Sequence, residues 1–284
     1  MTAVIDLHVH STFSDGTLSP AALIRLAEES GLKAVALCDH NTVEGLPDFL
    51  AAAEGSSVEA IPGIEFSTDY RGTELHILGL FVRECHYDAI MAKVNSMLIL
   101  KEKSNRDLVE ALKVAGLDLD YDAIKAGTPN GQVNRAVIAA EMVRLGYCPT
   151  VKDCFSQWLS PKRGYYKPPA RLDVFEVIAF IKSLGAVAVL AHPFLNLEED
   201  ALEEFLKAAV PCGLDAVETL YPKFTPEQRE RAREIAQANG LLISGGSDFH
   251  GENKPDIALG TGRGDLVVPH GLLENLRKNI LPEM

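Results

Sequence analysis

The segment DLHVHSTFSDG, residues 6–16, places two histidines at the end of a short apolar strand. His8 and His10 are separated by one residue, so the two-residue period of a strand turns both imidazoles to the same side. Asp15 follows in the next loop. Imidazole and carboxylate groups gathered in this way are typical of metal ligands, and the later strands show whether the pattern repeats.

Apolar strands and amphipathic helices alternate along most of the chain. Ser19 can cap the first helix, with Pro20 at its first position, and Thr225 with Gln228 can form a capping box. This alternation predicts a parallel sheet covered on both faces. About seven strands favour a closed or nearly closed barrel, and no GxGxxG follows the first strand, which disfavours a Rossmann-type sheet. We expect strands at 3–9, 33–38, 58–66, 74–82, 186–191, 215–220 and 241–246.

Helical periodicity replaces this alternation in the middle of the chain. We interpret residues 95–165 as a helical insertion that divides the barrel into a first part, 1–94, and a second part, 166–284. The length of 284 residues suits either one large α/β domain or a barrel with such an insertion.

The composition limits the classes of function. With 47% hydrophobic and 24% charged residues, the chain is typical of a globular protein with an ample core. No apolar run is long enough for a membrane span and no leader pattern begins the chain, so we expect a cytoplasmic protein without a membrane partner. The five scattered cysteines predict neither disulfides nor a thiolate zinc site. The net charge of −13 argues against binding of long duplex nucleic acid.

Ligand-type side chains recur at the strand ends, which in an α/β barrel meet at one mouth. One histidine near a strand end is usually structural, but nine ligand-type residues at strand ends, six of them histidines, favour a metal centre. Six imidazoles and three carboxylates exceed the needs of one ion and suit two or three Mn²⁺, Zn²⁺ or Fe²⁺ ions, with Mg²⁺ disfavoured. Such ions activate bound water, which predicts hydrolysis. The residues are His8, His10, Asp15, His40, Glu65, His76, His192, Asp248 and His250.

Six motifs together resemble the PHP (polymerase and histidinol phosphatase) family: DLHVHSTFSDG, ALCDHNT, PGIEFS, ELHILG, AHP and GSDFH, in that order. The resemblance implies a distorted (β/α)7 TIM-like barrel, a trinuclear site that often holds manganese, and phosphoester hydrolysis. It implies one ion on His8, His10, Glu65 and Asp248, a second on Glu65, His76 and His192, and a third on Asp15, His40 and His250. His192 and Asp248 are also our candidates for proton handling.

Within the family, the chain is most similar to stand-alone bacterial members with a helical insertion. That similarity implies a phosphatase that removes the 3′-phosphate of nucleoside 3′,5′-bisphosphates such as pAp, and this is our main prediction. The alternatives are a 5′→3′ exoribonuclease on short 5′-phosphorylated RNA and a small-molecule phosphatase of the histidinol-phosphatase kind. A metal-dependent amidohydrolase and a non-catalytic, metal-stabilised binding module are further possibilities.

The insertion is expected to choose the substrate. Asn134 and Arg135 begin a helix, where backbone N–H groups favour an anion, and the stretch SPKRGYYKPPAR, residues 160–171, follows. It places Lys162, Arg163, Lys167 and Arg171 around Tyr165 and Tyr166, which suits phosphate binding and base stacking. A surface helix and a proline-stiffened return to the barrel would explain both stretches without a ligand. The family resemblance supports Asn134, Arg135, Lys167 and Arg171 as contacts to the non-reacting phosphate or sugar.

Overall fold

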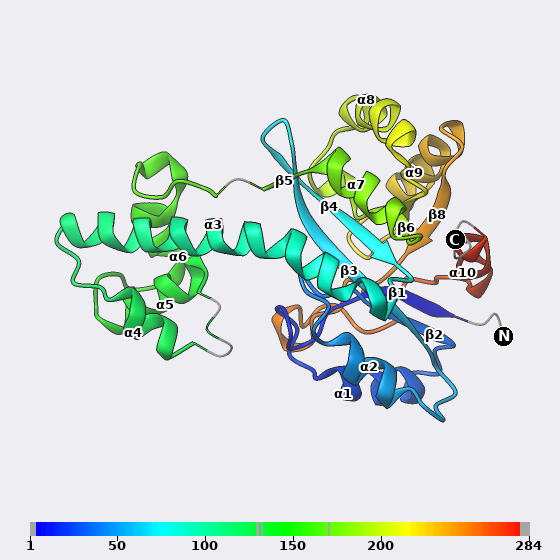
Figure 1. The fold of residues 1–284 in the computed structure, drawn as a ribbon, viewed down its shortest axis with the longest axis horizontal. Coiled ribbons are helices and arrows are strands. Elements are labelled where there is room, and N and C mark those ends of the chain that lie inside the picture. The colour runs from blue at the N-terminus through cyan, green and yellow to red at the C-terminus, as the bar shows by residue number, and fades with distance from the viewer. Residues whose placement is uncertain (1–3, 129–130, 132, 170, 279–284) are drawn as a thin grey trace. The chain divides into compact units, whose positions relative to one another are not determined.

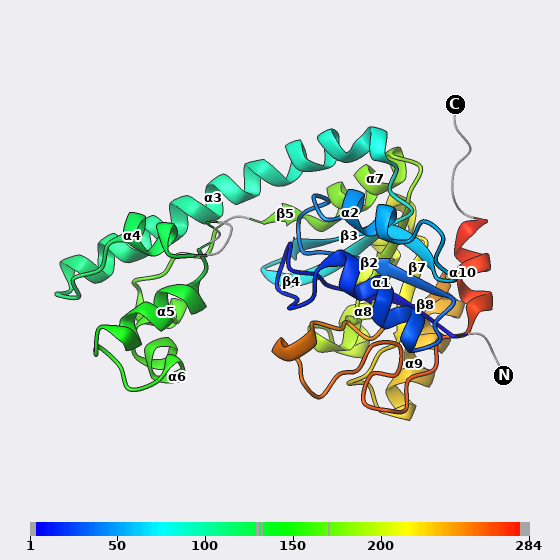
Figure 2. The ribbon, with the colours of Figure 1, turned by 90° about the horizontal axis from the view of Figure 1, so that it is seen from below.

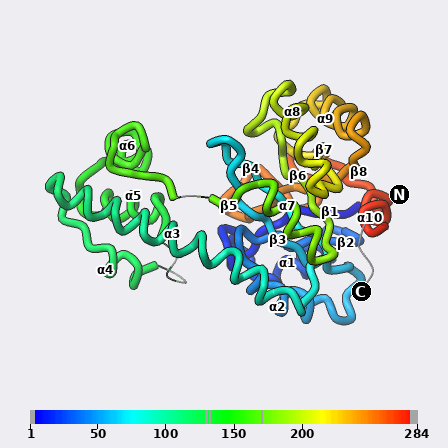
Figure 3. The backbone as a smooth tube through the Cα atoms, turned by 45° about the horizontal axis from the view of Figure 1, so that its top comes forward, coloured from blue at the N-terminus to red at the C-terminus, as the bar shows by residue number. Residues whose placement is uncertain are grey.

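The computed structural model describes residues 4–128, 131, 133–169 and 171–278. The chain forms two compact units, one from residues 1–92 and 172–284 and the other from 93–171. Figure 3 traces the chain from the first unit into the second and back. The sequence-based boundaries lie at 94/95 and 165/166. No helix in the described part of the chain has the length and apolar character that a membrane span needs.

The first unit is built on an eight-stranded mixed sheet. Its strands pair in the order β1-β2-β3-β4-β6-β7-β8, and β5 pairs with β3. The strands are β1 Ile5–Val9, β2 Ala34–Leu37, β3 Glu59–Tyr70, β4 Thr73–Leu80, β5 Leu172–Asp173, β6 Val187–Leu190, β7 Ala216–Leu220 and β8 Leu242–Gly245.

The predicted all-parallel sheet is wrong at β4, which runs antiparallel to both β3 and β6. The cause is a two-residue hairpin turn between the paired residues Tyr70 and Thr73. Arg71 has φ 53° and Gly72 has φ 86°, and two positive φ values in succession are what the tight turn of a β-hairpin requires. The chain therefore reverses direction at a point where we expected a crossover connection between parallel strands.

The first and last strands meet beside the ligand-type residues. The Asp248 N–H donates to the His8 carbonyl at 2.8 Å, and the His10 N–H donates to the Phe249 carbonyl at 2.9 Å. These bonds lie beyond the end of β8, so they join the chain segments without showing the closed barrel that the family resemblance implies. They nevertheless fix the position of β1 next to the loop after β8.

Helices pack around this sheet, as Figures 1 and 2 show. The predicted helix starts are confirmed: Ser19 Oγ accepts from the Ala22 N–H at 3.3 Å, and Thr225 and Gln228 form a complete capping box. Fully buried apolar side chains from β1, β2 and β6 form the core. The helices of this unit are α1 Pro20–Glu29, α2 Leu46–Ala52, α7 Val174–Ser183, α8 Glu199–Ala209, α9 Pro226–Ala238 and α10 His270–Arg277.

The second unit is helical and has a hydrophobic core of its own. It contains most of α3 Tyr87–Val114, with α4 Tyr121–Ala126, α5 Arg135–Arg144 and α6 Val151–Cys154. Leu108 and Leu112 of α3 pack in one buried cluster with Ile138 and Met142 of α5, and all four side chains are fully buried. This core makes the insertion a structured unit rather than an extended loop.

Gly246 follows β8 at a point where the backbone passes close to β1. A Cβ added there would lie 2.4 Å from His8 Cβ and 2.6 Å from His8 N, which forces one strand to move. We expect Gly246→Ala to lower the free energy of unfolding by about 1–3 kcal/mol, the usual cost of overpacking.

Chemical denaturation of the metal-free protein measures this effect. The control is Gly271→Ala in α10, where nothing lies within 4 Å of the added Cβ and no loss of stability is expected. An equally stable Gly246→Ala variant would show that the two segments are not held together as tightly as the structure indicates.

Candidate metal centre

The Glu65 carboxylate is the centre of the site. It lies on β3, it is fully buried, and five imidazoles surround its two oxygens. Ring nitrogens lie 2.8 Å (His76) and 3.1 Å (His192) from Oε1, and 3.0 Å (His40), 3.3 Å (His8) and 3.3 Å (His10) from Oε2. The strands β1, β3 and β4 and the segments after β2 and β6 therefore contribute to one cluster.

Two further carboxylates and the sixth histidine lie beside this cluster. Asp248 Oδ1 is 3.3 Å from His10 Nε2 and 3.4 Å from His250 Nδ1. Asp15 Oδ1 is 3.2 Å from His250 Nε2, and its Oδ2 is 3.9 Å from His40 Nε2. The structure thus brings together all nine residues that the sequence singled out, although His76 comes from a strand of opposite direction.

Three groups of these residues could each hold an ion, because their ligand atoms lie within 4.8 Å of one another. His192 and Asp248 stand outside the three groups and contact Glu65 and His10 instead. The groups overlap the three ligand sets that the family resemblance implies without matching them, so the assignment of ligands to individual ions stays a prediction. The groups are His10, Asp15, His40 and His250; His8, His10 and Glu65; and His40, Glu65 and His76.

The donor atoms themselves fit metal ions. His40 Nδ1 lies 3.0 Å from Glu65 Oε2, yet both atoms are buried without a hydrogen-bond partner in the described structure, and so is His76 Nδ1. His8 Nε2 and His10 Nε2 approach each other at 3.1 Å. Buried nitrogen and oxygen atoms normally have hydrogen-bond partners, and a cation shared among their lone pairs would satisfy them together.

The charges in the site also favour cations. Burial raises the pKa of the Glu65 carboxyl, but the surrounding imidazoles, first His40 and His76, outweigh it and hold that pKa well below its usual range. Conversely, the Glu65 charge outweighs burial and raises the pKa of His76 to about 10. The buried carboxylate therefore needs positive charge, which either protonated imidazoles or metal ions can supply.

Two residues of the site have strained backbones. His192 has φ 29° and Asp248 has φ 54°, in a region that residues other than glycine rarely adopt. Such strain persists where the surroundings hold the residue in place, and it is concentrated at functional sites. The Asp248 N–H is held by the His8 carbonyl, and the His192 N–H donates to Glu218 Oε2 at 2.8 Å.

Supporting residues were missed by the sequence reasoning. Asp39 accepts from the Ser11 N–H at 2.7 Å, the Ser11 hydroxyl at 2.6 Å and the Ser14 hydroxyl at 2.5 Å, which orders the loop between His10 and Asp15. A second buried carboxylate, Glu218, lies 3.1 Å from His8 Nδ1. The sequence signal that could have identified them is a charged residue next to or inside an apolar strand: Asp39 in ALCDH and Glu218 in DAVETL.

Asp248 is held from its other side. Its Oδ2 accepts from the Tyr221 hydroxyl at 2.8 Å and from Lys254 Nζ at 2.6 Å. These contacts leave Oδ1 directed toward His10. Tyr221 and Lys254 therefore fix the rotamer of a predicted ligand without being ligands themselves.

A cavity of about 160 Å³ opens onto the metal centre. Five of the predicted metal-ligand residues form one part of its wall, while two lysines, an asparagine, a leucine and a tyrosine form the rest. The latter are Lys223, Lys254, Asn196, Leu195 and Tyr221. Ammonium groups beside a metal centre suit an anionic substrate.

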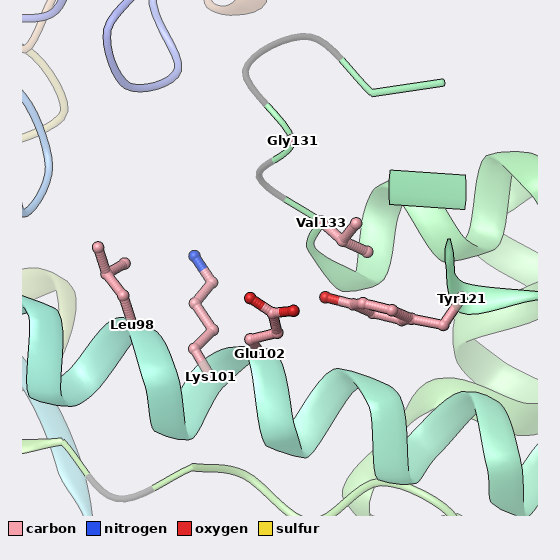
Figure 4. Close-up of a pocket in the computed structure, with 6 residues that line it drawn as sticks. All are labelled: Leu98, Lys101, Glu102, Tyr121, Gly131 and Val133. Atoms are coloured by element: carbon pink, nitrogen blue, oxygen red, sulfur yellow. The ribbon is translucent and has the colours of Figure 1, made fainter. Parts of the chain in front are cut away.

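A separate cavity of about 160 Å³ lies within the second unit. Figure 4 shows Lys101 and Glu102 projecting from α3 toward it and the Tyr121 hydroxyl directed toward the Glu102 carboxylate. Glu102 is already paired with Lys125 at 2.9 Å and with Arg106 at 3.1 Å. These ion pairs explain the Glu102 carboxylate in the lining as part of the packing of α3 against α4.

The four predicted substrate contacts all belong to the second unit. Asn134 caps α5 by accepting from the Val137 N–H at 3.0 Å. The Arg135 guanidinium stacks 4.3 Å from the centre of the Tyr166 ring. Of the other basic residues in this stretch, Arg163 donates to the Ser156 carbonyl at 2.7 Å, and Lys162 and Lys167 are exposed. Contact of Asn134, Arg135, Lys167 and Arg171 with a substrate stays a prediction.

Comparison with known proteins places this site in a family. The PHP domain signature matches residues 6–159. A 5′-3′ exoribonuclease of Haemophilus influenzae is 33% identical over 88% of this chain and 91% of its own length. A 3′,5′-nucleoside bisphosphate phosphatase of Chromobacterium violaceum is 27% identical over 90% of both chains. The crystal structure of a predicted metal-dependent phosphoesterase from Bifidobacterium adolescentis superposes with a TM-score of 0.79 at 28% identity, over 99% of this chain and 97% of the other.

The chain therefore belongs to the PHP family of metal-dependent phosphoesterases. The buried His-rich clusters around Glu65 are consistent with several metal ions. The expectation of a hydrolase, derived from the histidines and carboxylates alone, is confirmed.

Metal binding should stabilise the fold through Glu65. We expect excess Mn²⁺ to raise the thermal midpoint of the chelator-treated protein, because a ligand at about 100 times its Kd adds about 2.7 kcal/mol. Glu65→Gln should lose most of this rise, since its side chain meets five imidazoles.

Differential scanning calorimetry with and without EDTA measures the shift. The control is Glu59→Gln on the same strand, whose side chain pairs with Arg277 away from the histidines. A full Mn²⁺-dependent shift in Glu65→Gln would remove Glu65 from the centre of the site.

Proposed function

We propose that the protein is a metal-dependent 5′→3′ exoribonuclease that acts on short 5′-phosphorylated RNA. The observation that carries the proposal is the set of nitrogen and oxygen donors around Glu65, open to a cavity with two lysines. The choice of RNA rests on the exoribonuclease relative, which is more similar to this chain than the bisphosphate phosphatase is. It reverses the order of preference that the sequence analysis gave.

The second candidate is removal of the 3′-phosphate from a nucleoside 3′,5′-bisphosphate such as pAp. The Chromobacterium violaceum relative, which covers 90% of both chains, supports it. The two reactions break the same bond, between phosphorus and the 3′-oxygen of a nucleotide that carries a 5′-phosphate. They differ in whether the reacting phosphorus carries the rest of an RNA chain, so one site could perform both.

Three divalent ions, with Mn²⁺ most expected, would be held by the nine residues named above. When bound, such ions supply an activated water and neutralise charge on the phosphoryl oxygens. The residues of this chain would position the ions and the reacting phosphate. Asp248, fixed by Tyr221 and Lys254, and His192, with its backbone held by Glu218, would handle protons at the reacting phosphate.

A substrate panel separates the two candidates. We expect Mn²⁺-loaded protein to release 5′-mononucleotides stepwise from a 5′-phosphorylated RNA trinucleotide, with a higher kcat/KM than for phosphate release from pAp. AMP, which has no 3′-phosphate, should stay intact, and 3′-AMP and a 5′-hydroxyl trinucleotide should react slowly because they lack the 5′-phosphate.

Chromatography of the products and a phosphate assay at equal substrate concentrations give the answer. Faster turnover of pAp than of the trinucleotide would make the protein a 3′-phosphatase, with RNA trimming as a side reaction. Rapid hydrolysis of AMP would contradict both candidates.

We further propose that the second unit binds the phosphates or sugar of the substrate through Asn134, Arg135, Lys167 and Arg171. Arg135→Ala should raise KM for the trinucleotide and for pAp by about 10-fold or more, the cost of a lost charge-assisted hydrogen bond. The KM of a generic aryl phosphate should change little.

Steady-state kinetics with Arg144→Ala as control test this role. Arg144 lies on the same helix, where its guanidinium pairs with Glu141 at 2.6 Å. Equal changes of KM for nucleotides and for the aryl phosphate in Arg135→Ala would refute the assignment.

A further inference from the structure

We propose that Glu218 is a positioning residue of the metal centre: it fixes the tautomer of His8 and holds His192 in its strained conformation. The inference rests on the proposed metal-dependent function and names a residue outside the predicted ligand set. It is carried by the contacts of one fully buried carboxylate on β7.

The two oxygens of Glu218 connect separate parts of the sheet. Oε1 lies 3.1 Å from Nδ1 of His8 on β1, and Oε2 accepts from the His192 N–H, after β6, at 2.8 Å. One side chain thus ties the ends of β1 and β6 to β7. Each oxygen has a specific partner, as a buried carboxylate requires.

The contact with His8 determines which nitrogen can bind a metal. A carboxylate oxygen accepts hydrogen bonds, so His8 Nδ1 carries the hydrogen, and in the neutral ring that binds a metal Nε2 then carries the lone pair. That Nε2 atom is directed into the cluster, 3.3 Å from Glu65 Oε2 and 3.1 Å from His10 Nε2. Carboxylate–histidine pairs of this kind orient ligands in metal sites and increase their basicity.

Glu218 acts through these residues and not as a ligand. Its Oε1 contacts Nδ1 of His8 and its Oε2 contacts the His192 N–H, and Glu218 belongs to none of the three groups of potential ligand atoms among the described residues. The hydrogen bond to His192 also offsets the backbone strain of that residue. A buried carboxylate that accepts from the His192 N–H stabilises the left-handed conformation at φ 29°.

The variant Glu218→Gln tests the proposal because it keeps the shape and changes the hydrogen-bonding pattern. The amide has one acceptor and one donor group, whereas His8 Nδ1–H and the His192 N–H need two acceptors. We expect this variant to bind Mn²⁺ about 10- to 100-fold more weakly than wild type, the usual effect of losing such a support. Its metal content after gel filtration, measured by mass spectrometry, should fall by at least one ion per chain.

Two control variants separate positioning from general stability. Thr219→Val changes the neighbouring residue on β7, whose buried hydroxyl has no hydrogen-bond partner in the described structure, and should leave metal content unchanged. Asp215→Asn alters another largely buried carboxylate, just before β7, that accepts from Lys182 Nζ at 2.8 Å and from the Ala188 N–H at 2.9 Å. It should lower the thermal midpoint of the metal-free protein without lowering Mn²⁺ affinity as Glu218→Gln does.

Wild-type metal affinity in Glu218→Gln would overturn the proposal, and so would a loss of metal no greater than in an equally destabilised Asp215→Asn. If Glu218→Gln does not fold, long-range ¹H–¹⁵N spectra of the Zn²⁺-loaded wild type decide instead. The proposal requires hydrogen on His8 Nδ1, and hydrogen on Nε2 would overturn it. Because these readouts measure metal binding and tautomer, wild-type protein that binds metal but leaves RNA intact would refute the proposed function alone.

Discussion

The first unit is organised around one buried carboxylate, Glu65, that faces five imidazoles. A carboxylate without exposure to water is costly unless positive charge lies close to it. Protonated histidines can supply that charge, but only against their own burial, whereas divalent cations would satisfy all the donors together. The strands that carry these donors must therefore keep their ends within a few ångströms of one another. The strained backbones of His192 and Asp248 are features of this arrangement.

Much of this site could be predicted from the sequence, because metal ligands are chemically unusual residues at ordinary strand ends. His8, His10 and Glu65 stand out against apolar neighbours, and local reasoning is enough to find them. Local reasoning failed for β4, because we expected the preceding strand to end at Phe66, whereas β3 continues to Tyr70 and the turn at Arg71 and Gly72 reverses the chain. It also failed for Glu218, whose partner His8 is 210 residues away and is identified only by the fold.

The two candidate reactions make similar demands on the metal centre and different demands on its surroundings. Both need a phosphorus held against activated water, which the donors around Glu65 suit. A bisphosphate ends at the reacting phosphate, whereas RNA continues beyond it and needs an open path. The cavity at the metal centre is half lined by side chains that are not predicted ligands, among them Lys223 and Asn196. The choice between the two substrates therefore depends on side chains beside the predicted ligands as well as on the ligands themselves.

The bonds between His8 and Asp248 have a consequence for biosynthesis. The predicted ligands extend from residue 8 to residue 250, so a ribosome must release nearly all of these residues before the donors can meet. A nascent chain that stops after the second unit has Glu65 and His76 but lacks three of the donors. Tight binding of metal ions at this site would then coincide with completion of the sheet, and metal content would report whether a molecule has finished folding.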